Sequence, residues 1–490
     1  MPSFSCLLKL GIVSSLGFLL ILPLQLWGQW EEATTKFITQ DSVKQIIEKE
    51  HFTISADQHL HLIYQEIPIA GGSILYHTER DILGEWNNPT FINQDGLLVF
   101  NASLATHPTL SIPYVAYQAE QSIESEIFFA YRTSNGFWLT EQLTDNDLLD
   151  VSPSIKADPS GGIHICWIRE VEEEFYLMYA YRATESSPWD IYPIENAFPG
   201  SLGESSAPKL AVNDKGQVHV TFRSGIIGNL RISYAFLASQ QSDWFVERLP
   251  FFNNSEFEHD IAIDTDGLPK VVIGGLFTNN SWRVYEQKKD PKGDWRERNV
   301  IVSGGRGGLS SFWIDDQGYS HVLINVFFNS VANGRVNYYE NTSGSWRVRA
   351  LLGNGVVFAQ TVNNAIILMD AGGQAYCAAY LGSSPEQQNV IVYGAPVPAL
   401  ATSTTSSLSD PYIQVFPNPA QDQVFMDIPS EVRTPSLSLY GLDGRMYHQE
   451  LNPTPQEGQL KLELAGLSKG MYLLVIHHDK GVHRQMVIKE

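Results

Sequence analysis

The sequence predicts an all-β protein, in which a seven-bladed β-propeller closed by its N-terminal strand is followed by a small C-terminal Ig-like β-sandwich. Three observations support this fold class: tryptophans that recur at a regular step, a glycine turn motif with the same period, and fresh alternation of apolar and polar residues after residue 411. Short strands repeated about every 50 residues are typical of propellers. Six or eight blades are the alternatives to seven.

The first 28 residues have the composition of an export signal. Lys9 precedes an apolar run that extends from Leu10 to Leu26, and Gly28 offers a small residue for cleavage. We therefore expect a secretory signal peptide at residues 1–28, removed in the mature protein. A retained membrane anchor is the alternative, because the run is long enough to cross a bilayer. No second stretch of spanning length follows, so we expect no integral membrane span after signal removal.

Seven of the eleven tryptophans recur at steps of 51 to 56 residues, and each begins an alternating stretch that predicts a strand. They are Trp30, Trp86, Trp138, Trp189, Trp244, Trp295 and Trp346. Another short strand precedes six of them across a turn. The last repeat lacks such a tryptophan strand, whereas a spare one lies at the N-terminus, at Trp30–Thr39. We therefore expect this strand to complete the last blade and remove an exposed sheet edge, within a propeller that occupies residues 29–394.

A turn motif, Asp/Asn-x-x-Gly-x-x-His in its fullest form, has the same period, with full copies at 158–164, 213–219 and 315–321. Asp or Asn caps the turn and Gly supplies a positive φ. Because the copies belong to different blades, we do not expect their histidines to converge as zinc ligands. We expect no cofactor. Calcium is the one ion considered, at Asp145, Asp147 and Asp150 or at Asp264 and Asp266, with turn capping as the alternative.

Cysteine usage is sparse outside the predicted signal. Cys166 and Cys377 fall in equivalent strands of distant repeats. Since a disulfide requires Cα atoms within about 7 Å, we expect two buried free thiols.

Residues 395–411 are small, polar and proline-rich, which predicts a flexible linker. The segment 412–490 contains four motifs: Val415-Phe-Pro-Asn-Pro-Ala, Leu439-Tyr-Gly-Leu-Asp-Gly-Arg, Leu467-Ser-Lys-Gly-Met-Tyr and a terminal Met486-Val-Ile-Lys-Glu. Together they resemble the type A C-terminal sorting domain of the type IX (Por) secretion system. The resemblance implies recognition by that machinery, and a product that is secreted or attached to the outer cell surface of a Bacteroidota-type bacterium. An ordinary Ig-like adhesion sandwich is the alternative.

Three of the tryptophan turns, those containing Gly84, Gly293 and Gly344, resemble the Asp-box of sialidase-type (BNR) propellers. They are one residue shorter between Gly and Trp than the family motif. The arginine cluster of that family is not found near the first blade. The resemblance therefore implies a similar architecture and carries no sialidase residues over.

Charged residues expected on the loop-bearing face of the propeller are the candidate ligand-binding residues. They are Arg169, Arg223, Arg231, Glu258, His259 and Arg306. An arginine on a glycine-rich loop can bind a carboxylate or sulfate with two parallel hydrogen bonds, and adjacent Glu and His can supply an acid/base pair. Each residue is equally explained as a solvated loop charge. No catalytic residue is assigned.

The formal net charge is −22, from 54 acidic and 32 basic residues. Such a chain is poorly suited to a phosphate backbone, so we expect no nucleic-acid partner. The first hypothesis is an exported module whose propeller binds a glycan or a protein. The alternatives are an extracellular glycan-degrading enzyme, either hydrolase or lyase, and a structural or adhesion protein of the cell surface.

Overall fold

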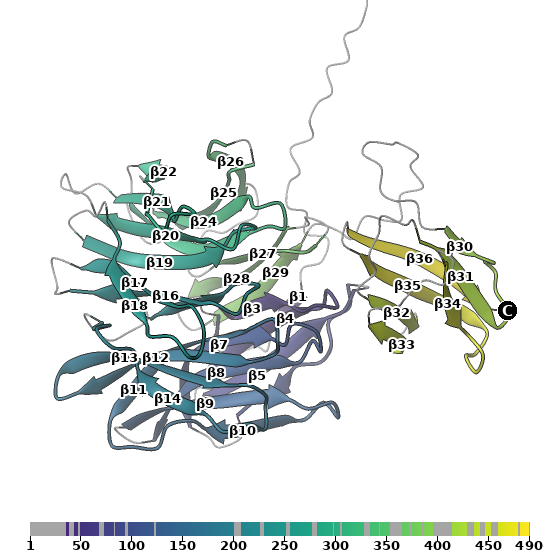
Figure 1. The fold of residues 1–490 in the computed structure, drawn as a ribbon, viewed down its shortest axis with the longest axis horizontal. Helices are drawn as coiled ribbons and strands as arrows, with labels where there is room; N and C mark the ends of the chain where they lie inside the picture. Colours follow the sequence, from purple (N-terminus) through teal and green to yellow (C-terminus); the bar gives the residue numbers. More distant parts are fainter. Residues whose placement is uncertain are drawn as a thin grey trace, which may run out of the picture.

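The described part of the chain consists of strands β1 to β36 and turns, with no helix, in this computed structural model (Figure 1). The all-β prediction is therefore confirmed. Within the same residues, no helix is long and apolar enough to cross a membrane. The predicted signal peptide and linker lie outside the described residues. These are 36–38, 44–47, 50–67, 73–82, 84–93, 97–121, 124–199, 207–225, 230–250, 255–276, 282–296, 298–303, 306–327, 334–342, 344–352, 365–371, 375–384, 387–394, 414–428, 436–441, 446–451, 459–478 and 481–489.

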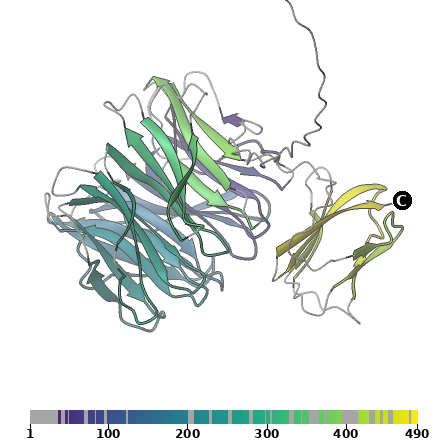
Figure 2. The ribbon, with the colours of Figure 1, turned by 90° about the horizontal axis from the view of Figure 1, so that it is seen from above.

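Before residue 395 the chain forms antiparallel units in which consecutive strands pair in sequence order (Figure 2). Unit 1 contains β2 (Lys44–Ile46), β3 (Phe52–Ile54), β4 (Leu60–Ile67), β5 (Ile74–Arg80) and β6 (Thr90–Phe91). Unit 2 contains β7 (Leu98–Thr106), β8 (Pro113–Gln121), β9 (Glu124–Arg132) and β10 (Trp138–Gln142). Unit 3 contains β11 (Leu149–Ala157), β12 (Ile163–Val171), β13 (Glu174–Arg182) and β14 (Asp190–Pro193). One parallel pair, Leu149 with Ser125, joins units 2 and 3 into a single sheet.

The next three units repeat the same order. Unit 4 contains β15 (Lys209–Val212), β16 (Val218–Ser224), β17 (Arg231–Leu237) and β18 (Phe245–Arg248). Unit 5 contains β19 (Ser255–Ile263), β20 (Pro269–Leu276), β21 (Trp282–Lys288) and β22 (Asn299–Ser303). Unit 6 contains β23 (Arg306–Ile314), β24 (Ser320–Phe327), β25 (Gly334–Glu340) and β26 (Arg347–Leu352).

The last unit combines the two ends of this region. It contains β27 (Ile366–Met369), β28 (Ala375–Ser384) and β29 (Gln387–Gly394), and β1 (Lys36–Ile38) adds to its outer edge. β1 pairs antiparallel with β29, with Phe37 opposite Ile391. The N-terminal strand therefore supplies the fourth strand of the last unit, as the sequence predicts.

The core lies between neighbouring units. One apolar cluster joins Tyr114 and Phe129 of unit 2 to Ile155 and Trp167 of unit 3, and equivalent clusters join units 4 and 5 and units 5 and 6. Each sheet therefore buries an apolar face against the next one, which is how two-faced β-layers stabilise each other. Cys166 and Cys377 are buried free thiols, as predicted.

Three of the repeated tryptophans connect the outer end of their unit to the preceding unit. The indole N–H of Trp189 donates to Glu141 and that of Trp295 donates to Glu247, both at 2.9 Å, while Trp138 donates to Thr90 at 3.2 Å. Each acceptor lies 48 residues before its tryptophan, one unit earlier. The prediction that each tryptophan begins a strand holds at Trp138, and at Trp189, Trp244 and Trp346 the strand begins one residue later. Trp86 and Trp295 instead form isolated bridges, and the outer strands begin several residues later.

The C-terminal module consists of two sheets on one apolar core. A three-stranded sheet contains β30 (Gln414–Phe416), β31 (Gln423–Asp427) and β34 (Gln459–Glu463). A four-stranded sheet contains β32 (Ser436–Gly441), β33 (Met446–Leu451), β35 (Gly470–His478) and β36 (Gly481–Lys489). Val424 and Leu462 of the first sheet pack in one cluster with Leu439 and Ile476 of the second. The Phe-Pro-Asn-Pro-Ala motif holds the last strand, because the Asn418 side chain accepts from the Ile488 N–H and the Ala420 N–H donates to the Ile488 carbonyl.

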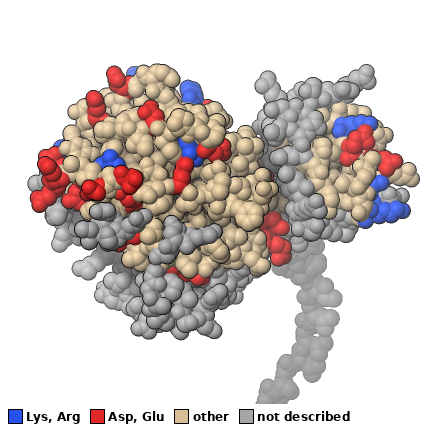
Figure 3. Space-filling model, turned by 90° about the horizontal axis from the view of Figure 1, so that it is seen from below, with Lys and Arg blue, Asp and Glu red and all other residues tan. Residues whose placement is uncertain are grey.

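Acidic side chains dominate the charged surface. On the face shown in Figure 3, Asp and Glu are spread over the larger body with few Lys or Arg between them. This distribution agrees with the formal charge of −22.

Candidate functional site

The first strands of neighbouring units run side by side, and a repeated hydrogen bond joins four pairs of them: those of units 2 and 3, 3 and 4, 5 and 6, and 6 and the last unit. Four of these strands carry a β-bulge just before the tie. The bulge turns one polar side chain toward the neighbouring strand, where it accepts a backbone N–H. The pairs are Ser103 with Ile155, Ser154 with Leu210, Asp260 with Phe312, and Ser311 with Ile367, at 3.0 to 3.2 Å.

A cavity of about 410 Å³ lies among these first strands. All seven of them line it: β3, β7, β11, β15, β19, β23 and β27. The lining residues come from the C-terminal halves of the longer strands, from Glu50, and from two turns that contribute Asn213 and Asp214, and Asp264 and Gly267. The cavity therefore lies toward the end of the units where first strands turn into second strands.

Glu50 places its carboxylate in this cavity and joins three units to the N-terminal segment. Its two oxygens accept from Lys156 at 3.2 Å and Lys209 at 3.1 Å, and also from the hydroxyls of Ser154 and Ser103. Its backbone has φ 70°, a left-handed conformation that is uncommon for a residue with a side chain. Its carbonyl accepts the Leu104 N–H, which is the tie between unit 1 and unit 2.

The charges around Glu50 compensate for its burial. Burial alone would raise the pKa of Glu50, but the two lysine ammonium groups outweigh it and lower the pKa to about 2. Burial would lower the pKa of Lys209, yet Glu50 and Asp260 raise it. Burial, assisted by Lys209, lowers the pKa of the adjacent His51 to about 3, so this histidine is neutral at pH 7. Glu50 and Lys209 are therefore both charged at neutral pH.

Arg169, the first of the residues predicted from sequence, forms a two-pronged ion pair with Asp150. Its Nε and Nη2 atoms lie 2.7 and 2.8 Å from the two carboxylate oxygens, and Asp150 is fully buried. Trp167 and Asn146 donate to the same carboxylate. Of the carboxylates considered for calcium, Asp150 is thus neutralised by an arginine, and Asp264 lies 2.6 Å from the Lys288 ammonium.

Arg223 and Arg231 lie on paired strands, β16 and β17, one register position apart. Arg223 is buried, and burial lowers its pKa from the ordinary value. Arg231 donates to the Leu230 carbonyl at 2.9 Å. These two arginines are therefore neighbours at one end of unit 4, outside the cavity.

Glu258 and His259 point away from each other, as adjacent residues of a strand do. The His259 Nε2 atom lies 3.1 Å from the Thr221 carbonyl of unit 4. The Glu258 carboxylate instead lies against Gly308 of unit 6, where an added Cβ would come within 2.7 Å of it. Arg306 begins β23, and its side chain lies outside the described residues. Glu258 and His259 thus face different units, and none of the five predicted residues whose side chains are described lines the cavity.

The histidines of the turn motif contact the turn and the third strand of their own units. In unit 3, His164 lies 3.1 Å from Asp158 and 2.6 Å from the Tyr179 hydroxyl. His321 repeats this arrangement in unit 6 with Asp315 and Tyr338. These histidines thus connect a turn carboxylate to a buried tyrosine within each unit.

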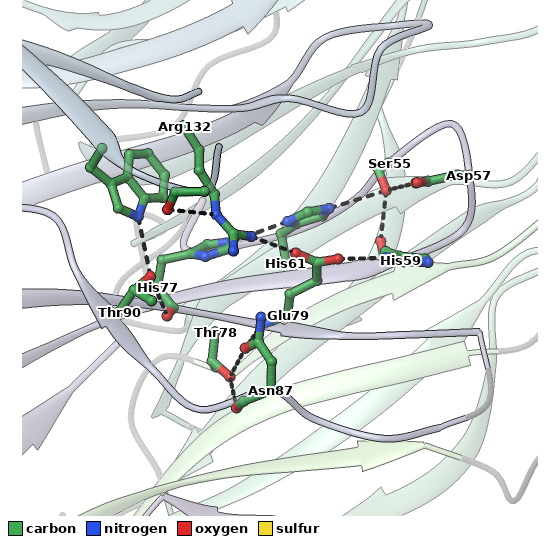
Figure 4. A network of polar contacts seen from close by, with 12 residues as sticks. Ser55, Asp57, His59, His61, His77, Thr78, Glu79, Asn87, Thr90 and Arg132 are labelled. Atoms are coloured by element: carbon green, nitrogen blue, oxygen red, sulfur yellow. Dashed lines mark hydrogen bonds and ion pairs between the residues drawn. The ribbon is translucent and has the colours of Figure 1, made fainter. Parts of the chain in front are cut away.

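Unit 1 replaces that tyrosine with a second histidine (Figure 4). His61 lies 3.0 Å from His77, and Glu79 accepts from His59 at 2.5 Å and from Arg132 of unit 2 at 2.9 Å. Burial lowers the pKa of His61 to about 4, whereas the hydrogen bond to Glu79 raises the pKa of His59 against the effect of burial. His61 is therefore neutral at pH 7, and its burial lowers stability as the pH falls from its ordinary 6.5 toward 4.

Apart from Asp264, which was considered for calcium, the charged cavity residues were missed by sequence reasoning, although a signal for their level in the structure exists. Counting back 35 residues from each tryptophan of units 2 to 6 gives one column of the repeat: Ser103, Ser154, Lys209, Asp260 and Ser311. At this position of the repeat, units 2, 3 and 6 have serine, whereas units 4 and 5 have the charged residues Lys209 and Asp260. Since one column of a repeat occupies one level of the structure, a lysine and an aspartate in successive repeats predict a charge pair between neighbouring first strands.

Residues 414–490 match the family described as the secretion system C-terminal sorting domain. The C-terminal module is therefore a type IX secretion sorting domain, and the resemblance found in the sequence is confirmed. The chain is accordingly a secreted or cell-surface protein that is handled by this secretion machinery, a route typical of Bacteroidota.

Comparison with known proteins adds likeness of fold. No curated protein matches the chain in sequence. A copper-bound fungal alcohol oxidase of the AA5 family is 11% identical with a TM-score of 0.50, over 93% of this chain and 99% of its own. The BP39L lectin from Burkholderia pseudomallei is 12% identical with a TM-score of 0.48, over 72% and 96%. A Trypanosoma rangeli sialidase with sialic acid is 8% identical with a TM-score of 0.42, over 92% and 88%. At these identities the likeness concerns architecture alone.

Proposed function

We propose that the chain is an exported binding protein, in which a seven-bladed β-propeller recognises a glycan or a protein outside the cell. The observation that carries the proposal is the cavity of about 410 Å³ lined by all seven first strands. Its volume lies within the range of about 300–1,000 Å³ that is typical of ligand pockets. A ring of seven units around one axis accounts for seven strands at a single cavity, and β1 on β29 accounts for its closure.

The domain boundaries follow from the same proposal. Residues 1–28 are the signal peptide, residues 29–394 the propeller, residues 395–411 a flexible linker and residues 412–490 an Ig-like sandwich that directs export. The two sheets on one core support the sandwich assignment. No membrane span remains in the product after signal removal.

Binding is favoured over catalysis by the contacts of the described polar residues. Arg169 is engaged by a buried carboxylate, and His259 contacts a backbone carbonyl. A general acid and base must both reach one substrate, yet Glu258 and His259 face different units. In the cavity, Lys156 is paired with Glu50, and this combination of a donor and carboxylate acceptors suits recognition of polar groups.

The test is a parallel assay of retention and turnover. The purified chain beginning at residue 29 is applied to arrays of polysaccharides, host glycans and extracellular proteins, and newly formed reducing or unsaturated ends are measured in the same samples. We expect saturable retention without new ends, and loss of retention by the heat-unfolded chain. Release of new ends would establish the enzyme alternative, and the absence of both signals would leave the structural or adhesion role.

A further inference from the structure

We infer that the cavity is the ligand site and that it binds an uncharged sugar unit, with Lys156 as a hydrogen-bond donor and an acidic mouth that excludes anionic sugars. This inference rests on the proposed binding function and specifies its ligand. It places the site at the end of the units opposite to the loop face that carries Arg169 and Arg223.

The wall of the cavity combines aromatic and polar side chains, as sugar recognition requires. Trp313 supplies accessible aromatic surface, whereas Phe52 and Phe312 also line the cavity but are almost fully buried in the apolar core. Aromatic rings cover the apolar faces of sugars, while polar groups bind the hydroxyls. The backbone ties between first strands hold Phe312 in place, because its N–H donates to Asp260.

Lys156 is the donor best placed for a hydroxyl. Its ammonium group carries three N–H donors, and the contact with Glu50 occupies one of them. About a third of its side chain, 34%, is exposed, whereas that of Lys209 is 8% exposed. Lys209 thus compensates the charge of Glu50 from the buried side, outside the cavity lining, whereas Lys156 lies in the lining.

The balance of charge excludes an anionic ligand. Among the described residues that line the cavity are four carboxylates, those of Glu50, Asp214, Asp260 and Asp264, and one ammonium group, that of Lys156. Lys209 and Lys288 contact two of these carboxylates from outside the lining. One net negative charge remains, and the exposed carboxylate of Asp214 lies at the mouth. A sugar carboxylate or sulfate would therefore meet repulsion on entry.

The experiment is calorimetric titration of the purified chain with disaccharides of both kinds. The neutral probes are cellobiose, mannobiose, lactose and N,N′-diacetylchitobiose, and the anionic probes are 3′-sialyllactose and digalacturonic acid. We expect at least one neutral probe to bind and both anionic probes to bind at least tenfold more weakly. Lys156→Met is expected to weaken binding of the neutral probe about tenfold or more.

A charge reversal at the mouth separates specificity from folding. Asp214 is exposed on a turn, so Asp214→Lys is expected to fold normally and to reduce the discrimination against anionic probes. Asp266→Lys is the matched control, since Asp266 is an exposed turn carboxylate that does not line the cavity. Neutral binding that Lys156→Met leaves unaltered, discrimination against anionic probes that Asp214→Lys leaves unaltered, or a preference for the anionic probes would overturn the inference. Retention on the arrays without disaccharide binding would overturn the inference and leave the proposed function intact, whereas no retention at all would remove both.

Discussion

The carboxylate of Glu50 illustrates how one residue can stabilise a large β-structure. It contacts two lysines and two serines from units 2, 3 and 4. Removing one partner of a buried ion pair leaves uncompensated charges, which is more costly than losing an exposed pair. The neighbouring His51 is neutral at pH 7 and adds no charge of its own. The loss of stability therefore depends on the Glu50 carboxylate alone.

We predict that Glu50→Gln lowers the free energy of unfolding by about 3 kcal/mol at pH 7. The folded pKa of Glu50 is about 2, below its ordinary 4.5, so the contribution of the carboxylate is fully present above pH 4.5 and lost as the pH falls through 2. Urea unfolding of both proteins between pH 7 and pH 2.5 should show the difference shrinking. Glu463→Gln, which removes an exposed pair with Lys461, should cost less than about 0.5 kcal/mol. An equal difference at both pH values would contradict the prediction.

At this scale the sequence predicts the turn residues well and the cavity poorly. Gly161, Gly216 and Gly318 adopt the positive φ that the turn motif requires, because that requirement is local. Glu50 lies in the N-terminal segment before the first full repeat, and its partners are more than 50 residues away. Such long-range pairing has no local signature, although the column that holds Lys209 and Asp260 offers a trace of it.

At the scale of strands, the contacts of Trp189 and Trp295 help to hold the outer strands of their units against the preceding unit. Trp189 donates to Glu141 of the preceding unit and also stacks on the Arg182 guanidinium, whose Cζ atom lies 4.3 Å from the indole ring. Arg182 itself bonds Glu141 at 2.6 Å. Lys289, Trp295 and Glu247 repeat this three-residue arrangement two units later. The spacing between successive tryptophans therefore equals the length of one unit, and for this reason the number of tryptophans predicts the number of units.

We predict that Trp189→Phe lowers the free energy of unfolding by about 2 kcal/mol, because a hydrogen bond to a charged acceptor and part of a cation–π contact are lost. Trp138→Phe is the matched control: its indole donates to the neutral Thr90 hydroxyl, so we expect about 1 kcal/mol. A double-mutant cycle with Glu141→Gln, followed by urea unfolding, should give a coupling of about 1 kcal/mol with Trp189. Independent effects of the two substitutions would contradict the proposed contact.

The strands themselves were predictable where their alternation is regular, as in the pair formed by β9 and β10. The outer strands of units 1 and 5 begin later than their tryptophans, at Thr90 and Asn299. In both units the turn closes with a carboxylate or an amide that caps its own backbone, such as Asp290, which accepts from the Lys292 and Asp294 N–H groups. This local capping competes with strand pairing, and the competition is not visible in alternation alone.

At the scale of the whole molecule, the sorting domain decides where the protein resides. We predict that deletion of residues 414–490 leaves the remaining chain inside a bacterium that has the type IX secretion system, whereas the intact chain is found outside the cell or on its surface. Fractionation followed by immunoblotting measures the distribution. Lys461→Met, an exposed change within the sorting domain, serves as the control and should be exported normally. Unchanged export of the deleted chain would contradict the assignment of this function to residues 414–490.

The pairing of β1 with β29 has a consequence for the order of events during synthesis. Lys36 pairs with Val392 across more than 350 residues of chain, so β1, which is synthesised first, lacks its partner strand β29 until nearly the whole region has been made. A prematurely terminated product would keep a free N-terminal segment, and a product without that segment would expose the edge of β29. Such edges invite aggregation and proteolysis. The last sheet is therefore complete only when β1 and β29 are both present, and a product that lacks either strand leaves the edge of the other unpaired.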